Sequence, residues 1–301
     1  MAQFSITRKT WKETLAESDG KPLILPVAHD ALTAILIERA GFLAYQIGGF
    51  AVDVARYGFP DIDLTRYGEK HGAVREIMGA SKLPVLVDGD DGYGDVKNVT
   101  HTVRGYESMG AAAIFIEDQL SPKKCGHMAD KSVVPRKVME EKLRAAAAAR
   151  DNPEALFILA RTDAIEPEGL SEALRRGERY LKAGGDGIYV EGPTTEKELE
   201  KIGREFKGQP LATSILENGG KTPFLPPQQF YEMGFTMLLY PTTVLFRMTR
   251  TIERGLQDLI AGKPIPAGEA VDMDRFEQIV NLPYWQKIER EFQGSDKPSG
   301  G

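Results

Sequence analysis

The sequence predicts a (β/α)8 barrel of the TIM type, followed by a C-terminal helical extension. Short β-prone runs recur eight times between residues 23 and 241, and most are almost continuously apolar, as strands buried on both faces should be. Helix-compatible stretches separate these runs, and a regular alternation of strand and helix indicates a parallel sheet. A doubly wound open sheet is the competing fold, but it usually has fewer strands.

The expected strands are the runs 23–29, 44–49, 84–90, 112–118, 156–162, 187–192, 210–215 and 237–241. Among the helices between them, 30–41 begins with Asp30 as a cap and 171–184 begins with Ser171, and both end on glycine. The stretch 140–151 is rich in alanine, the best helix former. These signals support helices between the strands.

The chain continues past the eighth strand. Residues 242–262 are expected to form the eighth helix, and another amphipathic helix is expected over 273–292. This last helix carries large apolar side chains, namely Phe276, Ile279, Leu282, Tyr284, Trp285, Ile288 and Phe292. Such a surface needs a partner, either the barrel wall or another subunit. We expect one domain over 1–294 and a disordered polar tail over 295–301.

The composition excludes several classes of protein. The 301 residues carry a formal net charge of −6, which argues against non-specific nucleic-acid binding. One cysteine cannot form an internal disulfide. No run approaches the roughly 18 uninterrupted apolar residues of a membrane span, and the first residues lack the apolar core of a signal peptide. We therefore expect a cytoplasmic protein without nucleic-acid or membrane partners.

Polar residues concentrate where the expected strands end. They include His29, Asp61, Asp88, Asp90, Glu117, Arg161, Glu191, Ser214 and Glu217. Functional residues of such barrels lie at the carboxyl ends of the strands and in the loops that follow. We therefore expect a single site at this rim.

Asp88 and Asp90 form the strongest metal-binding signal. Alternate residues of a strand share one face, and a divalent cation would remove the repulsion between the two carboxylates. Hard oxygen ligands suit Mg²⁺ or Mn²⁺, and Glu117 on the next strand can hold a metal-bound water. The alternative is an Asp- and Gly-rich turn that only caps a helix. Asp61, Glu117 and Glu191 at the same rim favour the metal, and zinc is disfavoured because one Cys and four His show no finger-type spacing.

Arg161 ends a buried strand, where a guanidinium is almost never left unpaired. It can form a structural bridge with Glu191, or it can bind a substrate carboxylate in bidentate fashion. The two roles can coexist.

Cys125 stands in an unusual setting for the only cysteine of the chain. A lone cysteine is most often a small buried hydrophobe. Here its neighbours are Lys123, Lys124 and His127, and nearby cations favour the thiolate and lower the thiol pKa. We expect Cys125 to transfer a proton or, alternatively, to act as a nucleophile. The long polar segment around it, with a glycine at 126, is typical of a gate that closes over a substrate.

The motifs VDGDDGYGD, IEDQ, KKCGH, ARTDA and ENGGKTP together resemble those of the isocitrate lyase/phosphoenolpyruvate mutase superfamily. The resemblance covers most of the chain, from residue 21 to residue 292, in the same order. KKCGH is specific within the superfamily, where it marks the carbon–carbon lyases and a few phosphonomutases. Length and layout look most like the short 2-methylisocitrate lyases and 2,3-dimethylmalate lyases.

The resemblance implies a metal site and an assembly. Asp88 and Asp90 would hold Mg²⁺, directly or through water, with Asp61 and Glu117 in its outer shell. The eighth helix would be exchanged between paired subunits, usually within a homotetramer, which would explain the apolar C-terminal tail.

The resemblance also implies how a small carboxylate substrate is bound. The backbone around Gly48 and Gly49 would cradle the α-keto acid product, and Arg161 would bind its carboxylate or hydroxyl oxygen. Glu191 would contact the substrate or orient Arg161.

The implied reaction is a retro-aldol cleavage. A 2-hydroxy acid chelates the metal, which stabilises the developing alkoxide, and an α-keto acid such as pyruvate or glyoxylate is released. Cys125 would protonate the other fragment, an enolate-like carboxylate, as the general acid/base. Lys123 and His127 would support it on a mobile loop.

Two positions depart from the lyase pattern. Ile47 stands where the second strand usually carries a small hydroxyl residue, which removes a hydrogen-bond donor and adds bulk near the keto acid. Ser214 stands where the seventh strand usually supplies Asn, and it is too short to reach as Asn does. Both changes concern substrate recognition, so the identity of the hydroxy acid stays open. Glu217 is a further candidate substrate contact, as is His29, which is alternatively structural.

Three rival functions remain. A phosphonomutase would rearrange a P–C bond and needs no cysteine acid. An oxaloacetate decarboxylase or hydrolase would release CO₂ or oxalate. The non-enzyme alternative is a barrel that keeps the motifs but only binds a ligand or serves as an assembly subunit. The intact rim carboxylates, arginine and thiol segment favour an enzyme, and we expect a carbon–carbon lyase.

Overall fold

The computed structural model describes residues 8–293, which form two compact units that meet in the chain between Phe246 and Arg247. The expected single domain over 1–294 stays a prediction, and the expected tail over 295–301 lies outside the described residues.

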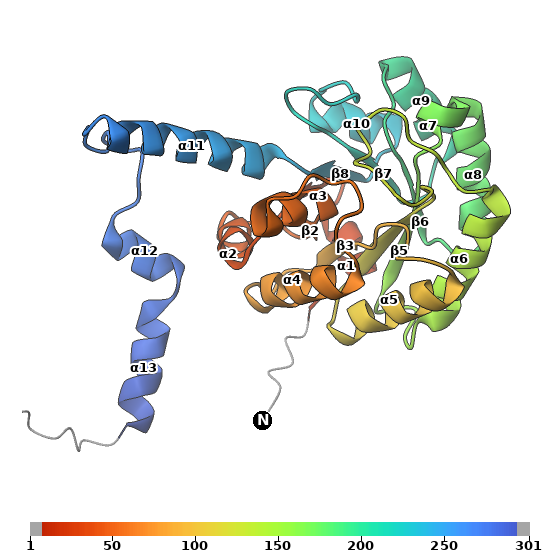
Figure 1. The fold of residues 1–301 in the computed structure, drawn as a ribbon. Helices are drawn as coiled ribbons and strands as arrows, with labels where there is room; N and C mark the ends of the chain where they lie inside the picture. Colours follow the sequence, from red (N-terminus) through yellow and green to blue (C-terminus); the bar gives the residue numbers. More distant parts are fainter. Residues whose placement is uncertain (1–7, 294–301) are drawn as a thin grey trace, which may run out of the picture. The chain divides into compact units, whose positions relative to one another are not determined.

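The first unit contains a barrel of parallel strands, as predicted (Figure 1). In the described part of the chain, these strands are β1 (Leu23–Pro26), β2 (Tyr45–Ile47), β3 (Val85–Asp88), β4 (Ala113–Glu117), β5 (Phe157–Thr162), β6 (Gly187–Val190), β7 (Leu211–Ser214) and β8 (Met237–Tyr240). They pair in the order β1-β8-β7-β6-β5-β4-β3-β2. A parallel bridge between Val27 and Gln46 brings β1 to β2 and closes the barrel. All eight expected strands are therefore confirmed.

Helices alternate with the strands and surround the barrel (Figure 1). They are α1 (Trp11–Glu17), α2 (Ala31–Arg39), α3 (Gly49–Val52), the π-helical turn η1 (Asp53–Tyr57), α4 (Tyr67–Gly79), α5 (Val96–Ser108), α6 (Arg136–Ala149), α7 (Ile165–Glu168), α8 (Leu170–Lys182), α9 (Glu196–Glu205) and α10 (Pro227–Met233). Asp30 caps α2 as expected, because its side chain accepts a hydrogen bond from the amide of Thr33. Ser171 does not cap α8: the helix begins one residue earlier, after Gly169, and has no side-chain cap.

The strands alternate between two apolar cores. Residues such as Leu86, Phe115 and Leu159 fill the inside of the barrel, together with Trp11 of α1. Their neighbours along the strands pack outward against the helices in the second, larger core. Two residues beyond Leu86, Phe115 and Leu159, the inward face continues as Asp88, Glu117 and Arg161. The apolar interior thus gives way to charged groups at the carboxyl ends of the strands.

The C-terminal helices show one difference from expectation. Helix α11 (Thr243–Ile260) forms, but the helix expected over 273–292 is two helices, α12 (Met273–Ile279) and α13 (Leu282–Phe292). Asn281 separates them with a φ of 58°, a left-handed conformation that Asn tolerates better than most residues. Pro283 follows in the first turn of α13, where its missing N–H costs no hydrogen bond.

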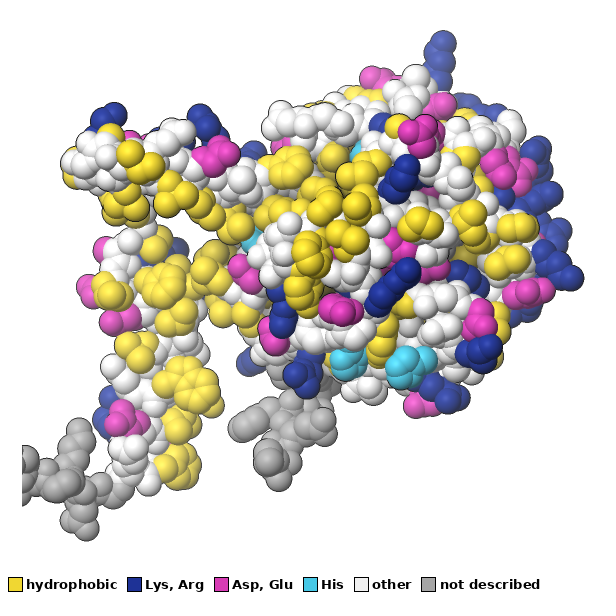
Figure 2. All heavy atoms as spheres, in the orientation of Figure 1, with side chains coloured by type: hydrophobic (Ala, Val, Ile, Leu, Met, Phe, Trp, Pro, Cys, Tyr) yellow, Lys and Arg dark blue, Asp and Glu magenta, His cyan; other side chains and the backbone are white. Residues whose placement is uncertain are grey.

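Many apolar side chains lie at the surface of α11, α12 and α13 (Figure 2). They include Leu256, Leu259, Ile260, Met273, Phe276, Tyr284, Trp285 and Phe292. The exchanged helix and the homotetramer stay predictions. Within residues 8–293, none of the helices is long and apolar enough to cross a bilayer.

Candidate active site

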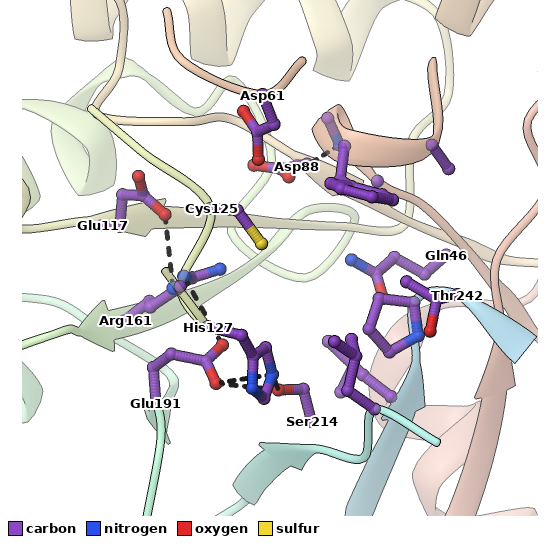
Figure 3. A pocket seen from close by; sticks show the side chains of 18 of the residues that line it. Gln46, Asp61, Asp88, Glu117, Cys125, His127, Arg161, Glu191, Ser214 and Thr242 are labelled. Atoms are coloured by element: carbon purple, nitrogen blue, oxygen red, sulfur yellow. Dashed lines mark hydrogen bonds and ion pairs between the residues drawn. The ribbon is translucent and has the colours of Figure 1, made fainter. Parts of the chain in front are cut away.

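A cavity that opens to solvent lies at the carboxyl ends of the strands (Figure 3). It brings together most of the predicted site residues, namely Gly48, Gly49, Asp61, Asp88, Glu117, Lys123, Cys125, His127, Arg161, Glu191 and Ser214. These come from most of the strand ends and from two loops, as a TIM-barrel site requires.

Asp88 and Asp90 lie at the end of β3, where a cation-rich network holds them. Asp88 Oδ2 accepts a hydrogen bond from the amide of Gly49 at 2.8 Å, and Oδ1 accepts one from the amide of Asp90 at 2.9 Å. Lys123 Nζ lies 2.5 Å from Asp90 Oδ1 and 2.7 Å from Asp61 Oδ1. The predicted carboxylate group is therefore assembled, with the Lys123 ammonium between two of its members.

The protonation of these acids differs with their surroundings. Burial, and then the charge of Asp90, raises the pKa of Asp88 to about 6. Burial also acts to raise the pKa of Asp90, but Lys123 and Lys70 outweigh it and lower that pKa. Burial raises the pKa of Glu117 well above its usual value. Asp88 and Glu117 therefore hold a proton more readily than free carboxyl groups, mainly because they are buried, whereas Asp90 stays ionised.

Glu117 contributes an unpaired ligand atom. Its Oε2 lies 3.2 Å from Arg161 Nε, whereas its buried Oε1 has no hydrogen-bond partner among the described residues. Within residues 8–293, no three His, Cys, Asp or Glu side chains converge as a ready-made metal cage. A cation at this site would therefore keep much of its coordination to water or to a ligand.

Arg161 is held by carboxylates on one edge and by aromatic rings on its faces. It donates to both oxygens of Asp163, at 2.8 and 3.0 Å, and its Nη2 lies 3.4 Å from Glu191 Oε2. The guanidinium carbon lies 5.5 Å from the ring centre of Phe115 and 5.0 Å from that of Tyr189. The expected bridge to Glu191 is thus present, and Arg161 also lines the cavity.

The segment around Cys125 lies over the cavity and is tied down at several points. The amide of Cys125 donates to the carbonyl of Asp61 at 3.1 Å. The side chain of Gln119 exchanges two hydrogen bonds with the backbone of Lys124. Buried Lys131 donates to the carbonyl of Gly126 and pairs with Asp163 Oδ1 at 3.0 Å.

The thiol of Cys125 points into the cavity (Figure 3). The expectation that its cationic neighbours lower its pKa is wrong. Burial, and then the negative charge of Asp61, raises the pKa of Cys125 to about 11. The charge of Lys123 is instead directed at Asp61 and Asp90. At neutral pH the side chain is therefore a protonated thiol, able to give up a proton.

His127, Ser214 and Glu191 form a hydrogen-bonded chain. His127 Nδ1 accepts from the amide of Lys221 at 3.1 Å, so neutral His127 carries its proton on Nε2. Nε2 lies 3.0 Å from Ser214 Oγ, which donates to Glu191 Oε1 at 2.8 Å. Burial lowers the pKa of His127, which keeps it neutral. Ser214 thus links the thiol segment to the carboxylate of Glu191.

Four predicted residues do not line the cavity. Asp90 lies behind it, paired to Lys123, and His29 lies at the start of α2, with Nε2 3.2 Å from Thr33 Oγ1. Glu217 is half-buried in the loop after β7, and its role stays a prediction. Ile47 does not line the cavity, contrary to expectation: its side chain packs in the core outside the barrel. The physical reason is strand alternation, which turns Gln46 inward and Ile47 outward.

Several functional candidates were missed by the sequence reasoning. Gln46 and Thr242 line the cavity, and Asp163 and Lys131 hold Arg161 and the thiol segment. Gln46 could have been found from the alternation of β2, because a buried polar residue stands between two apolar ones. The pairing of Lys131 with Asp163 spans 32 positions in the chain and gives no local signal.

Comparison with known proteins places the fold and motifs in context. Residues 13–260 match the family model described as phosphoenolpyruvate phosphomutase. The chain is 39% identical over 271 residues to a 2,3-dimethylmalate lyase of Eubacterium barkeri, covering 90% of this chain and 92% of the relative. It is 38% identical over 232 residues to a 2-methylisocitrate lyase of Bacillus subtilis (strain 168), covering 77% and 75%. A solved structure of oxaloacetate acetylhydrolase aligns with a TM-score of 0.88 at 25% identity, covering 95% of this chain and 97% of that one.

Proposed function

The chain belongs to the phosphoenolpyruvate phosphomutase family, and from this premise we propose that it is a Mg²⁺-dependent lyase of substituted 2-hydroxy di- or tricarboxylates. The expected enzyme class is confirmed, since the named relatives are lyases. The products are an α-keto acid, pyruvate or glyoxylate, and a carboxylate. The single observation that carries the proposal is the position of the Cys125 thiol, which faces a cavity that also contains Arg161 and the acidic rim.

The acidic rim fits Mg²⁺. Asp88 lines the cavity and supplies a hard oxygen ligand, whereas Asp90, which is paired to Lys123, would act through water. The unpartnered Oε1 of Glu117 offers an acceptor for a metal-bound water. Mg²⁺ in proteins often uses only one or two carboxylates and keeps several waters, so a complete cage of side chains is not required. When bound, the cation supplies Lewis-acid polarisation of the oxygens of the substrate.

Arg161 and the backbone of α3 prepare the site for the α-keto acid half. The Arg161 guanidinium, fixed by Asp163 and two aromatic rings, presents positive charge to a carboxylate without reorganising. The amide of Gly49 already donates to Asp88, so the backbone at this position orients the metal-binding carboxylate.

Cys125 acts as the general acid. A carboxylate of the acidic rim accepts the proton of the substrate hydroxyl. The carbon–carbon bond then breaks, and the electron pair of that bond stays on the fragment that becomes the second carboxylate. The thiol delivers its proton to the carbon that carries this pair. His127, Ser214 and Glu191 keep the thiol segment in place from the opposite side.

A coupled assay for pyruvate or glyoxylate tests the proposal. Turnover of substituted malates should require Mg²⁺ and stop with EDTA. Cys125→Ser should lower kcat by about 10²–10⁴-fold, because a positioned acid contributes that much. The backbone bond of Cys125 to Asp61 does not involve the thiol, so the variant should keep the wild-type circular dichroism. A parental rate for this variant on the cleaved substrate would rule out the acid role.

Hydrolysis of oxaloacetate is a second candidate, because the chain superposes well on a solved oxaloacetate acetylhydrolase. Oxalate and acetate would then appear from oxaloacetate. Phosphonate turnover, followed by phosphorus NMR, would instead favour the mutase reaction. Covalent modification of Cys125 during turnover, visible by mass spectrometry, would favour a nucleophile over an acid.

A further inference from the structure

The cavity is divided into a charged half and an uncharged half. Its acids and cations come from β3 to β6 and the loops near them, including Asp88, Glu117 and Arg161. The lining from β2, α3, β7 and β8 is uncharged and includes Gln46, Leu239 and Thr242. Figure 3 shows Gln46 and Thr242 across the cavity from Glu117, Arg161 and Glu191. A substrate whose reacting carboxylate lies in the charged half must place another group in the uncharged one.

Gln46 has a buried amide oxygen without a hydrogen-bond partner among residues 8–293. Its side chain is on the inward face of β2, is 3% exposed and lines the cavity. The buried Oε1 accepts no hydrogen bond from any described residue. The amide nitrogen lies beside Gly48, where an added Cβ would be 3.4 Å away. The backbone at position 48 thus leaves this amide room at the cavity wall.

Thr242 provides a second unpartnered group. It follows Pro241 at the end of β8, is 2% exposed and lines the same cavity. Its Oγ1 has no hydrogen-bond partner in the described part of the chain. Ser214 differs, because its hydroxyl is already engaged with His127 and Glu191.

Buried polar groups in native proteins are nearly always hydrogen-bonded, so two orphaned groups on one wall indicate a ligand or water between them. The ligand group must donate a hydrogen bond to Gln46 Oε1, which excludes a carboxylate and a plain alkyl group. The uncharged half also contributes no cation to offset the desolvation of a carboxylate. A hydroxyl group both donates and accepts, so it can donate to Gln46 Oε1 and accept from the Thr242 hydroxyl.

We propose that Gln46 and Thr242 form a subsite for an uncharged, hydroxyl-bearing substituent of the substrate, with Leu239 and Pro241 packing against its carbon atoms. This inference rests on the proposed lyase function and assigns the part of the substrate that the charged half does not hold. The subsite selects among hydroxy acids that share the same reacting atoms.

A pair of compounds tests this subsite. The first compound is malate with a hydroxymethyl group on carbon 2, and the second is malate with an ethyl group at the same carbon. The two differ only in that a methyl group replaces the hydroxyl of the substituent, and cleavage of either one releases acetate. The same pair of substituents on carbon 3 covers the other position, with glyoxylate as the common product. We expect wild-type kcat/KM to be at least about 10-fold higher for the hydroxyl compound, because a site built to bond a hydroxyl rejects its apolar analogue.

Variants at the two residues should reverse this preference. Gln46→Met keeps the approximate volume and removes the amide, and Thr242→Val removes only the hydroxyl. Each should lower kcat/KM for the hydroxyl compound and leave it unchanged or higher for the ethyl compound. Thr213→Val is the matched control, because Thr213 is also buried and unpartnered but does not line the cavity. That control should keep the wild-type ratio.

Two results would overturn the inference. One is a wild-type ratio near unity or in favour of ethyl, and the other is an equal loss for both compounds in Gln46→Met. If none of the compounds is cleaved, the lyase proposal fails. Calorimetric measurement of binding of the same pairs then tests the subsite independently of turnover. Preferential binding of the hydroxyl compound that Gln46→Met abolishes would support it, and equal or absent binding would refute it.

Discussion

Replacing Lys131 with Met should loosen the segment that carries Cys125. The Lys131 ammonium is buried, lies 3.0 Å from Asp163 Oδ1 and donates to the carbonyl of Gly126. Methionine keeps an unbranched stem but removes the charge, so the carboxylate and the carbonyl each lose a partner. Breaking a buried ion pair from one side typically costs about 3–5 kcal/mol. Because Asp163 keeps two hydrogen bonds from Arg161, we expect the lower end of that range, about 3 kcal/mol.

The effect on catalysis should exceed a general loss of stability. A displacement of about 1 Å can cost about 10²-fold in rate, so we expect a comparable drop in kcat at a temperature where the variant is folded. Urea denaturation and the coupled assay measure the two effects. Exposed Lys137 on α6 offers the control: Lys137→Met should change stability by less than about 0.5 kcal/mol. Lys131→Arg retains the charge and should recover part of the rate. If Lys131→Met unfolded at the same urea concentration as the wild type and had the same kcat, the reasoning would be refuted.

Three further predictions concern the same site. Burial acts to raise the pKa of Asp163, but its cationic partners outweigh burial and lower it. The stability it contributes is present above the unfolded-state pKa of about 3.9 and is lost as the pH falls through the folded value. Urea denaturation across a pH series should therefore show a steeper loss below about pH 4 in the wild type than in Asp163→Asn. Gly126→Ala should lower kcat with unchanged circular dichroism, because its Cβ would lie 2.7 Å from Glu191 Cγ, whereas Gly72→Ala, which meets nothing within 4 Å, should be neutral. Asp88→Asn should weaken Mn²⁺ binding measured by electron paramagnetic resonance; unchanged affinity would remove Asp88 from the metal site.

The barrel and its polar rim could be predicted from the sequence because both depend on local patterns. Buried strands show as apolar runs, and the rim follows from where those runs end. Asp88, Glu117 and Arg161 were found in this way, and the structure brings them to one cavity. The break between α12 and α13 was missed because apolar spacing continues across it, although Asn281 and Pro283 are residues typical of a helix boundary.

The orientation of the side chains along β2 shows a limit of motif comparison. Because Ile47 departs from the pattern of the family, the sequence predicted that this residue alters substrate recognition. The structure places Ile47 in the outer core and presents Gln46 to the cavity. Register within a three-residue strand decides which of two adjacent residues meets the substrate, and a shift of one position exchanges their faces.

The environment of Cys125 shows why proximity along the chain is a poor guide to electrostatics. Lys123 stands two residues away, yet its ammonium is directed at Asp61 and Asp90 and is largely neutralised there. The thiol instead experiences burial and the charge of Asp61, a residue 64 positions earlier, and its pKa rises. A raised pKa suits an acid that must keep its proton until a carbanion-like fragment forms, whereas a lowered one would suit a nucleophile. Burial of the thiol and the placement of Asp61 near it therefore favour the acid role over the nucleophilic one, a choice that the sequence left open.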